Sequence, residues 1–277
     1  MAPTTRTELR RLVLAFPTVA VPRPAIDSAA QLARFLRASL LGLFVEDPRL
    51  LAAASLPFVR QLDASLRAWR PFSHQRLLED YAALAAALRR RLLESAQTSG
   101  VPAEFAVLRG ELDAVVNSST APTDLVILFE SVATWPLLEP RAAAGTVLVP
   151  LDARPNQGPV VALIGEADDI AIGVAKRIAA SAELEIILVD AARQHSSAYW
   201  AGRGGVDQAQ AGQGADRGAA RLVAPRNVTA SGGHFLQSGL PAASLVVLTR
   251  TTLGQLGERP IAIARSRPEP WLVLEDR

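Results

Sequence analysis

Short runs of consecutive apolar residues alternate along this chain with longer stretches in which apolar residues recur every three or four positions. A run that is apolar throughout is typical of a strand with helices on both faces of a parallel sheet, and the wider spacing is typical of an amphipathic helix. The apolar runs cover residues 11–16, 40–45, 104–108, 124–129 and 146–150, and then 160–164, 184–190, 220–225, 244–249 and 271–274. Because strands and helices alternate, the sequence predicts an α/β protein with parallel sheets and right-handed crossovers.

The helical patterns carry recognisable start and stop signals. They cover residues 26–38, 47–62, 73–99, 111–118 and 169–182. Asp27 or Ser28 can cap the first helix and Asp47 the second, and we expect Pro57 to kink the second helix. Gly100 follows the long third pattern and is expected to end it.

The order of strands and helices in the first half restarts at Val160, which predicts two domains of similar design. We place the first domain at residues 1–151 and the second at 160–277, with a proline- and glycine-containing linker at 152–159. Each is long enough to bury its own core. The second copy departs from the first at residues 199–220, where glycine and polar residues predict a mobile loop or a frayed helix.

Composition narrows the class of protein. Hydrophobic residues make up 49% of the 277 residues, so a folded chain is expected. No apolar run approaches the roughly 20 residues that a membrane-spanning helix needs. The first apolar run is broken early by Pro17, which does not fit a secretory signal. We therefore expect a cytoplasmic protein with no membrane partner.

The chain has no cysteine, which excludes disulfides, thiolate catalysis and cysteine-bound metals. The three histidines, His74, His195 and His234, are far apart in the sequence, and no calcium-loop spacing is present. No metal site is therefore predicted.

Charge gives little reason to expect nucleic acid. The net charge is +2 and the pI about 9.6, which agree because every basic residue except Lys176 is an arginine. The tight basic run, Arg89-Arg90-Arg91, lies on a predicted helix without interleaved aromatic residues. A nucleic-acid partner is therefore unlikely from the sequence.

No catalytic constellation stands out. Ser238-Gly239 lacks the preceding glycine of a serine-hydrolase elbow, and no glycine-rich dinucleotide motif follows the first strand. The paired acids at 46–47 and 168–169 lie where helix N-caps are expected. We predict no catalytic residue; a slow ATPase would have no identifiable base.

Residues 41–48 and 50–60 combine a second strand that ends in an acidic residue with a helix that carries the step Leu56-Pro57-Phe58. In this respect the chain resembles tandem members of the universal stress protein family. The resemblance implies two Rossmann-like (adenine nucleotide α-hydrolase-like) domains, each a mostly parallel five-stranded sheet flanked by helices. It also implies that the two halves pair through their last strands, as subunits do in dimers of that family.

Many members of that family bind ATP through a loop after the fourth strand with the pattern G-x2-G-x9-G-(S/T). Glycines there let backbone N–H groups approach phosphate oxygens closely. The first half has Glu130 to Pro136 at this place and no glycine before Gly145. Phe16-Pro17-Thr18 stands where the family has an aspartate after its first strand. We therefore expect that the first half cannot hold a triphosphate.

The second half keeps a remnant of the pattern. Gly254-Gln255-Leu256-Gly257 matches G-x2-G, but Arg265 replaces the third glycine before Ser266, and the spacing is two residues short. An ordinary turn and helix start explains the same residues. By resemblance, the candidate nucleotide-binding residues are Gly165, Glu166, Arg250, Gly254, Gly257, Arg265 and Ser266.

The sequence thus favours a non-catalytic stress-response or regulatory protein that acts by binding an unknown protein partner or by self-association. Nucleotide binding is expected to be largely lost, with no cofactor. The alternative is a switch that responds to ATP or AMP bound in the second domain. A two-lobed small-molecule binder is disfavoured, because a single linker joins the halves.

Overall fold

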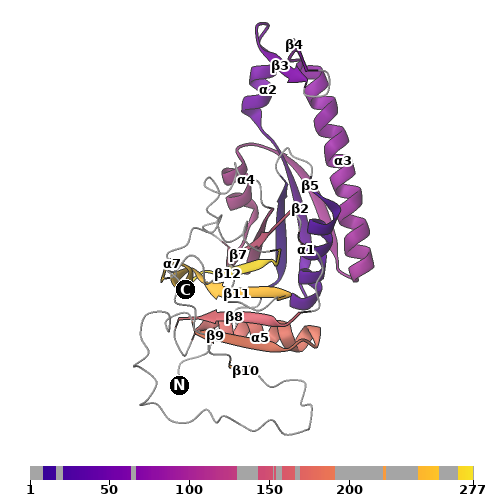
Figure 1. Cartoon of the computed structure of the whole chain (residues 1–277). Helices are drawn as coiled ribbons and strands as arrows, with labels where there is room; N and C mark the ends of the chain where they lie inside the picture. Colours follow the sequence, from indigo (N-terminus) through magenta and orange to yellow (C-terminus); the bar gives the residue numbers. More distant parts are fainter. Residues whose placement is uncertain are drawn as a thin grey trace. The chain divides into compact units, whose positions relative to one another are not determined.

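The structure is a computed structural model that describes residues 9–16, 21–63, 67–129, 143–151, 153, 158–165, 169–190, 221–222, 243–255 and 268–276. The chain divides into two compact units, unit 1 (Met1–Asp152) and unit 2 (Ala153–Arg277). Both are α/β units, so the predicted fold class is confirmed (Figure 1).

In its described part, unit 1 has a sheet of five parallel strands. They are β1 (Arg11–Phe16), β2 (Ser39–Glu46), β5 (Ala103–Arg109), β6 (Asp124–Phe129) and β7 (Gly145–Val149). Their order is β7-β6-β1-β2-β5, so β1 is central. Leu12, Leu14 and Phe16 of β1 are fully buried, as expected for a strand that helices cover.

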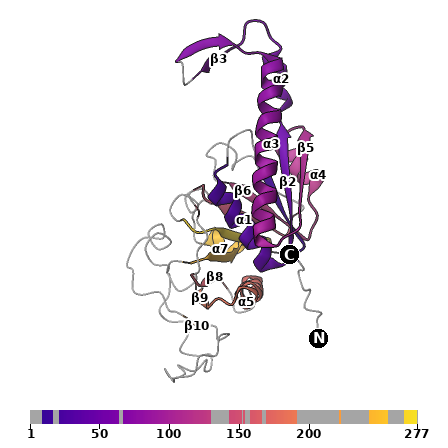
Figure 2. The same cartoon turned by 90° about the vertical axis from the view of Figure 1, so that its right-hand side faces the viewer.

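Two helices of unit 1, α1 (Arg23–Leu36) and α3 (His74–Ser99), pack together on one face of this sheet, and α4 (Leu112–Ser119) lies on the other (Figures 1 and 2). The right-handed crossover rule gives the same arrangement for this strand order. As predicted, α3 ends at Gly100, which has φ +68°. Ser73 caps its start, with Oγ accepting the N–H of Arg76 at 3.4 Å.

The predicted caps of α1 were wrong. The helix begins at Arg23, so Asp27 and Ser28 lie inside it. Pro22 and Pro24 set the first turn, because proline fixes φ near the helical value and has no N–H to satisfy there. Asp27 instead accepts a short hydrogen bond from the hydroxyl of Ser95 on α3.

The helix predicted over residues 47–62 was also wrong in its second part. α2 (Pro48–Ala54) is capped as expected, with Asp47 Oδ1 accepting the N–H of Arg49 at 2.8 Å. It ends before Pro57, because proline in a helix interior removes a hydrogen bond and disfavours helix at the preceding residue. The chain then forms an antiparallel hairpin of β3 (Arg60–Asp63) and β4 (Ala68–Pro71), which lies beyond the ends of α2 and α3 that point away from the sheet (Figures 1 and 2).

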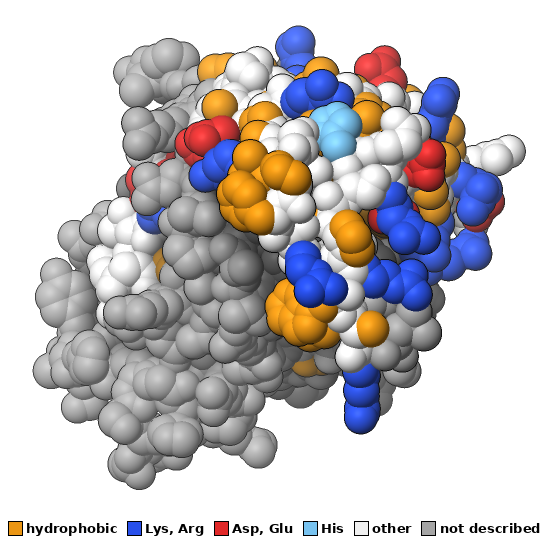
Figure 3. Space-filling view, turned by 90° about the horizontal axis from the view of Figure 1, so that it is seen from above, with side chains coloured by type: hydrophobic (Ala, Val, Ile, Leu, Met, Phe, Trp, Pro, Cys, Tyr) orange, Lys and Arg blue, Asp and Glu red, His pale blue; other side chains and the backbone are white. Residues whose placement is uncertain are grey.

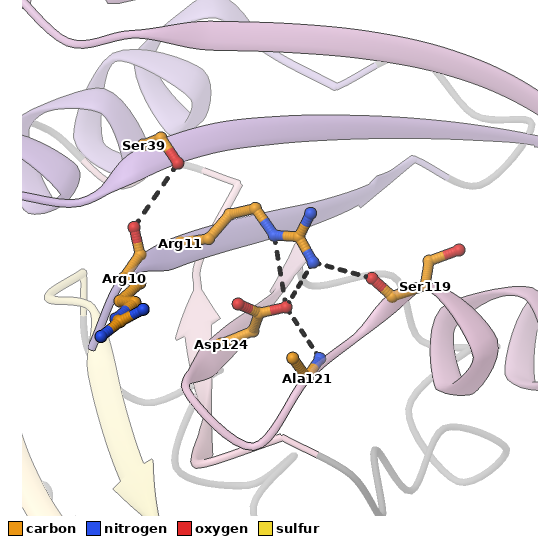
Figure 4. A network of polar contacts seen from close by, with 6 residues as sticks. All are labelled: Arg10, Arg11, Ser39, Ser119, Ala121 and Asp124. Carbon is orange, nitrogen blue, oxygen red and sulfur yellow. Dashed lines mark hydrogen bonds and ion pairs between the residues drawn. The ribbon is translucent and has the colours of Figure 1, made fainter. Parts of the chain in front are cut away.

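A half-buried ion pair links the amino ends of β1 and β6 (Figure 4). Arg11 Nη2 donates to Asp124 Oδ2 at 2.6 Å and to the carbonyl of Ser119 at 3.0 Å. The same Asp124 oxygen accepts the N–H of Ala121 at 2.8 Å. This network lies at the opposite edge of the sheet from the carboxyl strand ends, where ligands bind in such folds.

Unit 2 repeats the design with five parallel strands among its described residues. They are β8 (Val160–Ile164), β9 (Ile186–Asp190), β10 (Arg221–Leu222), β11 (Leu245–Thr249) and β12 (Trp271–Leu274), in the order β10-β9-β8-β11-β12. Two helices are described, α5 (Ile170–Ala182) and α7 (Arg250–Gln255). Residues 199–220 and most of the predicted linker lie outside the described residues.

Candidate functional site

In open parallel sheets, ligands bind outside the carboxyl ends of the strands where the strand order reverses. In unit 2 this point lies between β8 and β11, because β9 and β10 follow on one side and β12 on the other. The described polar groups at this edge come from the segments that follow β8, β11 and β12. They are Gly165, Asp169, Thr249, Arg250, Thr251, Thr252, Gln255, Glu275 and Asp276.

Two N–H groups in the first turn of α7 already donate to side chains of the same chain. Thr251 donates to Asp276 Oδ2 twice, from its N–H at 2.7 Å and from its hydroxyl at 2.6 Å. The N–H of Thr252 donates to Thr249 Oγ1 at 3.2 Å. These are among the N–H groups that lack partners within a helix and attract anions.

Arg250, predicted as a phosphate partner, forms an ion pair with Glu275. Its Nε lies 2.9 Å from each carboxylate oxygen, and its Nη2 donates to Oε1 at 2.6 Å. Forked contacts of this kind are among the stronger charge-assisted hydrogen bonds.

Asp169 links three segments of the edge. Its Oδ1 accepts the N–H of Ala171 at 2.8 Å and so caps α5, as predicted. Its Oδ2 accepts from the N–H of Gly165 at 3.2 Å and from the hydroxyl of Thr252 at 3.3 Å. The carboxylates of Asp169 and Asp276 therefore both contact the first turn of α7.

Gly165 lies where this arrangement requires a glycine. A Cβ there would be 2.9 Å from Gln255 Oε1 and 3.0 Å from Thr252 Oγ1, closer than ordinary contacts. The missing side chain lets the end of β8 approach α7. The structure thus brings two predicted residues, Gly165 and Arg250, to one edge.

Gly254 lies within α7, not in a loop that precedes a helix. A Cβ at this position would meet nothing within 4 Å, so packing does not demand glycine there. The other predicted site residues, Glu166, Gly257, Arg265 and Ser266, lie outside the described residues.

The described strand ends at the corresponding switch point of unit 1 are apolar. The strand order reverses between β1 and β6, and their last residues are the buried Phe16 and Phe129, whose rings stack with centroids 5.6 Å apart. Phe105 of β5 lies 6.0 Å from the Phe16 ring. A Cβ on Gly42 would lie 2.7 Å from Phe105 and 2.6 Å from Leu92, so glycine makes room for this packing. The segment 130–136, where a phosphate loop was judged absent, lies outside the described residues.

Tyr81 is a titratable residue that lies within the helical pattern of residues 73–99, where the sequence indicates no role for it in a site. It is buried against Phe44, near the carboxyl end of β2. Burial, and then the nearby carboxylates of Asp47 and Glu46, raise the pKa of Tyr81 above its ordinary value of 10.0. Its phenol therefore stays protonated at neutral pH. The sequence contains one signal for this feature: a tyrosine among apolar residues at helical spacing, together with the acidic residues Glu46 and Asp47 at the end of a strand.

The described residues contain neither a cluster of metal ligands nor a membrane-spanning helix. No three histidine or acidic side chains there lie close enough together to share a metal ion. Within the same residues, no helix combines the length and apolarity needed to cross a bilayer.

No protein-family model matches the chain, and no curated protein matches it significantly. Solved structures do match. A universal stress protein from Archaeoglobus fulgidus DSM 4304 is 10% identical, with a TM-score of 0.58 and 97% of each chain covered.

Two other solved structures superpose less closely. A putative universal stress protein from Pseudomonas aeruginosa UCBPP-PA14 is 13% identical, with a TM-score of 0.47, over 97% of this chain and 94% of that one. A universal stress protein in complex with cAMP is 15% identical, with a TM-score of 0.32, over 52% of this chain and 98% of that one. These two scores are too low to carry an argument. The Archaeoglobus match shows that the chain has the α/β fold of a universal stress protein.

Proposed function

We propose that this chain is a stress-response or regulatory protein of the universal stress protein type that acts without catalysis, by binding another protein. One observation carries the proposal: at the strand ends of unit 2, the chain's own carboxylates hold the groups that a phosphate would need. Asp276 accepts hydrogen bonds from the N–H and the hydroxyl of Thr251, and Glu275 accepts hydrogen bonds from the guanidinium of Arg250.

Electrostatics explains why these contacts oppose nucleotide binding. A phosphate binds a helix start through N–H donors and positive charge. Here a phosphate would have to displace Asp276 from Thr251 and compete with Glu275 for Arg250. It would also approach the carboxylate of Asp169, and like charges repel at such distances.

The described part of unit 1 supports the same proposal. The strand ends at its switch point carry the buried rings of Phe16 and Phe129. Aromatic carbons offer no donor to a phosphate oxygen.

The contacts of His74 and Ser55 support the part of the proposal that excludes catalysis. His74, the one histidine among the described residues, lies 3.1 Å from both the carbonyl of Leu51 and the hydroxyl of Ser55. The Ser55 hydroxyl also donates to the Leu51 carbonyl at 3.1 Å. These contacts tie both side chains to the end of α2, where they stabilise a helix terminus.

Thermal unfolding with adenine nucleotides tests the proposal. Ligand at 100 times its Kd stabilises a protein by about 2.7 kcal/mol, which moves the Tm by several degrees. We expect millimolar ATP or AMP to leave the Tm of the wild-type chain unchanged. A clear rise would contradict the proposal and favour the nucleotide-responsive switch. Gly257→Asp would then be expected to abolish the shift without unfolding the protein.

A further inference from the structure

The hairpin of β3 and β4, together with the segment 55–59 that leads into it from α2, exposes large apolar side chains at the end of unit 1 that lies away from the sheet. The exposed fractions are 76% for Phe58, 59% for Trp69, 56% for Leu62 and 44% for Leu56. Figure 3 looks onto this end and shows hydrophobic side chains interspersed with Lys and Arg at the surface. Single exposed apolar residues are ordinary, but a group of this kind marks an interaction surface.

The strand register places the apolar residues on one face of the hairpin. Leu62 lies directly opposite Trp69, and Arg60 directly opposite Pro71. Directly opposed residues share a face, as do alternate residues of a strand, so these four side chains lie together. All four are exposed, whereas Gln61 and Arg70 on the other face are less so. The apolar face of the hairpin is therefore the one open to solvent.

Positive charge accompanies this face. Residues 56–76 contain four arginines and one acidic residue, Asp63. Arg60 Nη2 donates to the carbonyl of Trp69 at 3.1 Å, which holds a guanidinium beside the apolar pair. Pairing the hairpins of two copies would bring like charges together, which is unfavourable. Charge complementarity instead calls for a partner with acidic groups.

Charge also distinguishes between classes of acidic partner. Glu79 and Asp80 lie exposed near the start of α3, next to the hairpin. A uniformly negative lipid or nucleic-acid surface would repel them, whereas a protein can place acids opposite the arginines alone.

We propose that the apolar face of the β3–β4 hairpin docks into an apolar groove bordered by aspartate and glutamate on a partner protein. This inference rests on the proposed function, because it names the surface through which the chain binds another protein. The anchors are Trp69 on this face and Phe58 in the segment that precedes β3, since tryptophan is among the residues that contribute most at protein interfaces and aromatic rings bury large areas. Arg60 and Arg67 face the acidic border.

Site-specific photo-crosslinking tests the proposal in the full-length protein, in the cells that produce it. The crosslinking residue replaces Leu62 in one variant and Leu93 in the control. Leu93 is an exposed apolar residue of α3 in the same unit. We expect a protein adduct from position 62 that is absent from position 93. The crosslinked peptide should lie beside an apolar groove with acidic neighbours.

Two further measurements test the chemistry of the contact. Arg60→Glu/Arg67→Glu should lower the yield of the adduct by at least about tenfold, because it turns attraction into repulsion. Crosslinking from position 62 in lysate, with both arginines unchanged, should decrease gradually as the salt concentration rises, because salt screens the attraction between the arginines and the acidic border. Trp69→Ser should abolish the adduct.

Several results would overturn the proposal. The first is an equal yield of adduct from positions 62 and 93. The second is an adduct with lipid, nucleic acid or a second copy of the chain. The third is a protein adduct whose yield changes neither with salt nor with the charge reversal. If the same protein copurifies equally with the wild type and with the hairpin variants, the partner binds at another surface, and the proposed function still holds. A nucleotide-dependent Tm shift contradicts the proposed function and leaves the hairpin experiment unaffected.

Discussion

At the scale of single residues, a few side chains decide what each strand end can do. Asp169 caps α5 and also accepts from Gly165 and Thr252. The capping role was readable from the sequence, because an acid followed by a helical pattern predicts an N-cap. The contact with Thr252 was not, since the two residues are 83 positions apart.

Asp169→Ala should therefore destabilise unit 2. Loss of a helix cap costs about 0.5–2 kcal/mol, and the hydroxyl of Thr252 and the N–H of Gly165 would lose an acceptor as well. Chemical denaturation should show a lower midpoint. Asp169→Asn keeps an acceptor oxygen and should lose less. Equal losses for the two variants would contradict this expectation, because they would mean that a single acceptor oxygen at this position contributes nothing.

Two glycines offer a matched pair. A Cβ on Gly42 would lie 2.6 Å from Leu92, so Gly42→Ala should cost about 1–3 kcal/mol through overpacking. A Cβ on Gly254 would lie in open space within α7, so Gly254→Ala should be neutral or stabilise by up to about 1 kcal/mol. Unfolding midpoints measure both. A larger loss at Gly254 than at Gly42 would contradict the packing described for unit 1.

Tyr81 gives a pH dependence with a defined sign. Its pKa is raised in the folded state by burial and by the carboxylates of Asp47 and Glu46, so the folded state holds the proton more tightly than the unfolded one. Below pH 10.0, the titration of Tyr81 therefore does not change the free energy of unfolding. As the pH rises through this value and beyond, the unfolded state loses the proton first, and the free energy of unfolding falls.

Tyr81→Phe should remove that part of the alkaline loss. The chain suits the measurement, because it has two tyrosines and one lysine, and arginine does not titrate in this range. Ultraviolet absorbance of tyrosinate would follow the titration directly. An unchanged alkaline profile in Tyr81→Phe would assign the loss to other groups.

At the scale of elements, the structure has the β3 strand of a hairpin where the sequence predicts the second part of a helix over residues 47–62. The apolar spacing of Leu50, Leu51, Ala54, Phe58 and Leu62 fits one helix face, and Pro57 was read as a kink. Periodicity cannot show that Phe58 and Leu62 face solvent, and it is the exposure of such residues that points to a partner. The long helix α3 was predicted well, because its range of 74–99 and its end at Gly100 agree with the pattern over residues 73–99.

Trp69→Ser should therefore leave the stability of the isolated protein within about 0.5 kcal/mol, since its indole is largely exposed. Leu88→Ala, at a fully buried position on α3, should cost about 2–5 kcal/mol. Thermal unfolding of the two variants compares them. A Trp69 variant as destabilised as the Leu88 variant would show that the hairpin face packs within the fold.

At the scale of the whole molecule, alternating apolar runs and helical patterns predicted the α/β class and the parallel sheets, because burial between helices leaves a periodic record in the sequence. The candidate site was predicted less well. Arg250 and Glu275 follow neighbouring parallel strands, β11 and β12, so their proximity could have been inferred from strand order. Their pairing could not, because spacing along the chain does not report which donor meets which acceptor.

Titration calorimetry with ATP measures anion binding at the strand ends of unit 2. We expect no saturable heat from the wild-type chain up to millimolar ATP, because the carboxylates of Asp276 and Glu275 already bind Thr251 and Arg250. Saturable binding by the wild type with a Kd below about 1 mM, or roughly −4.1 kcal/mol, would contradict it.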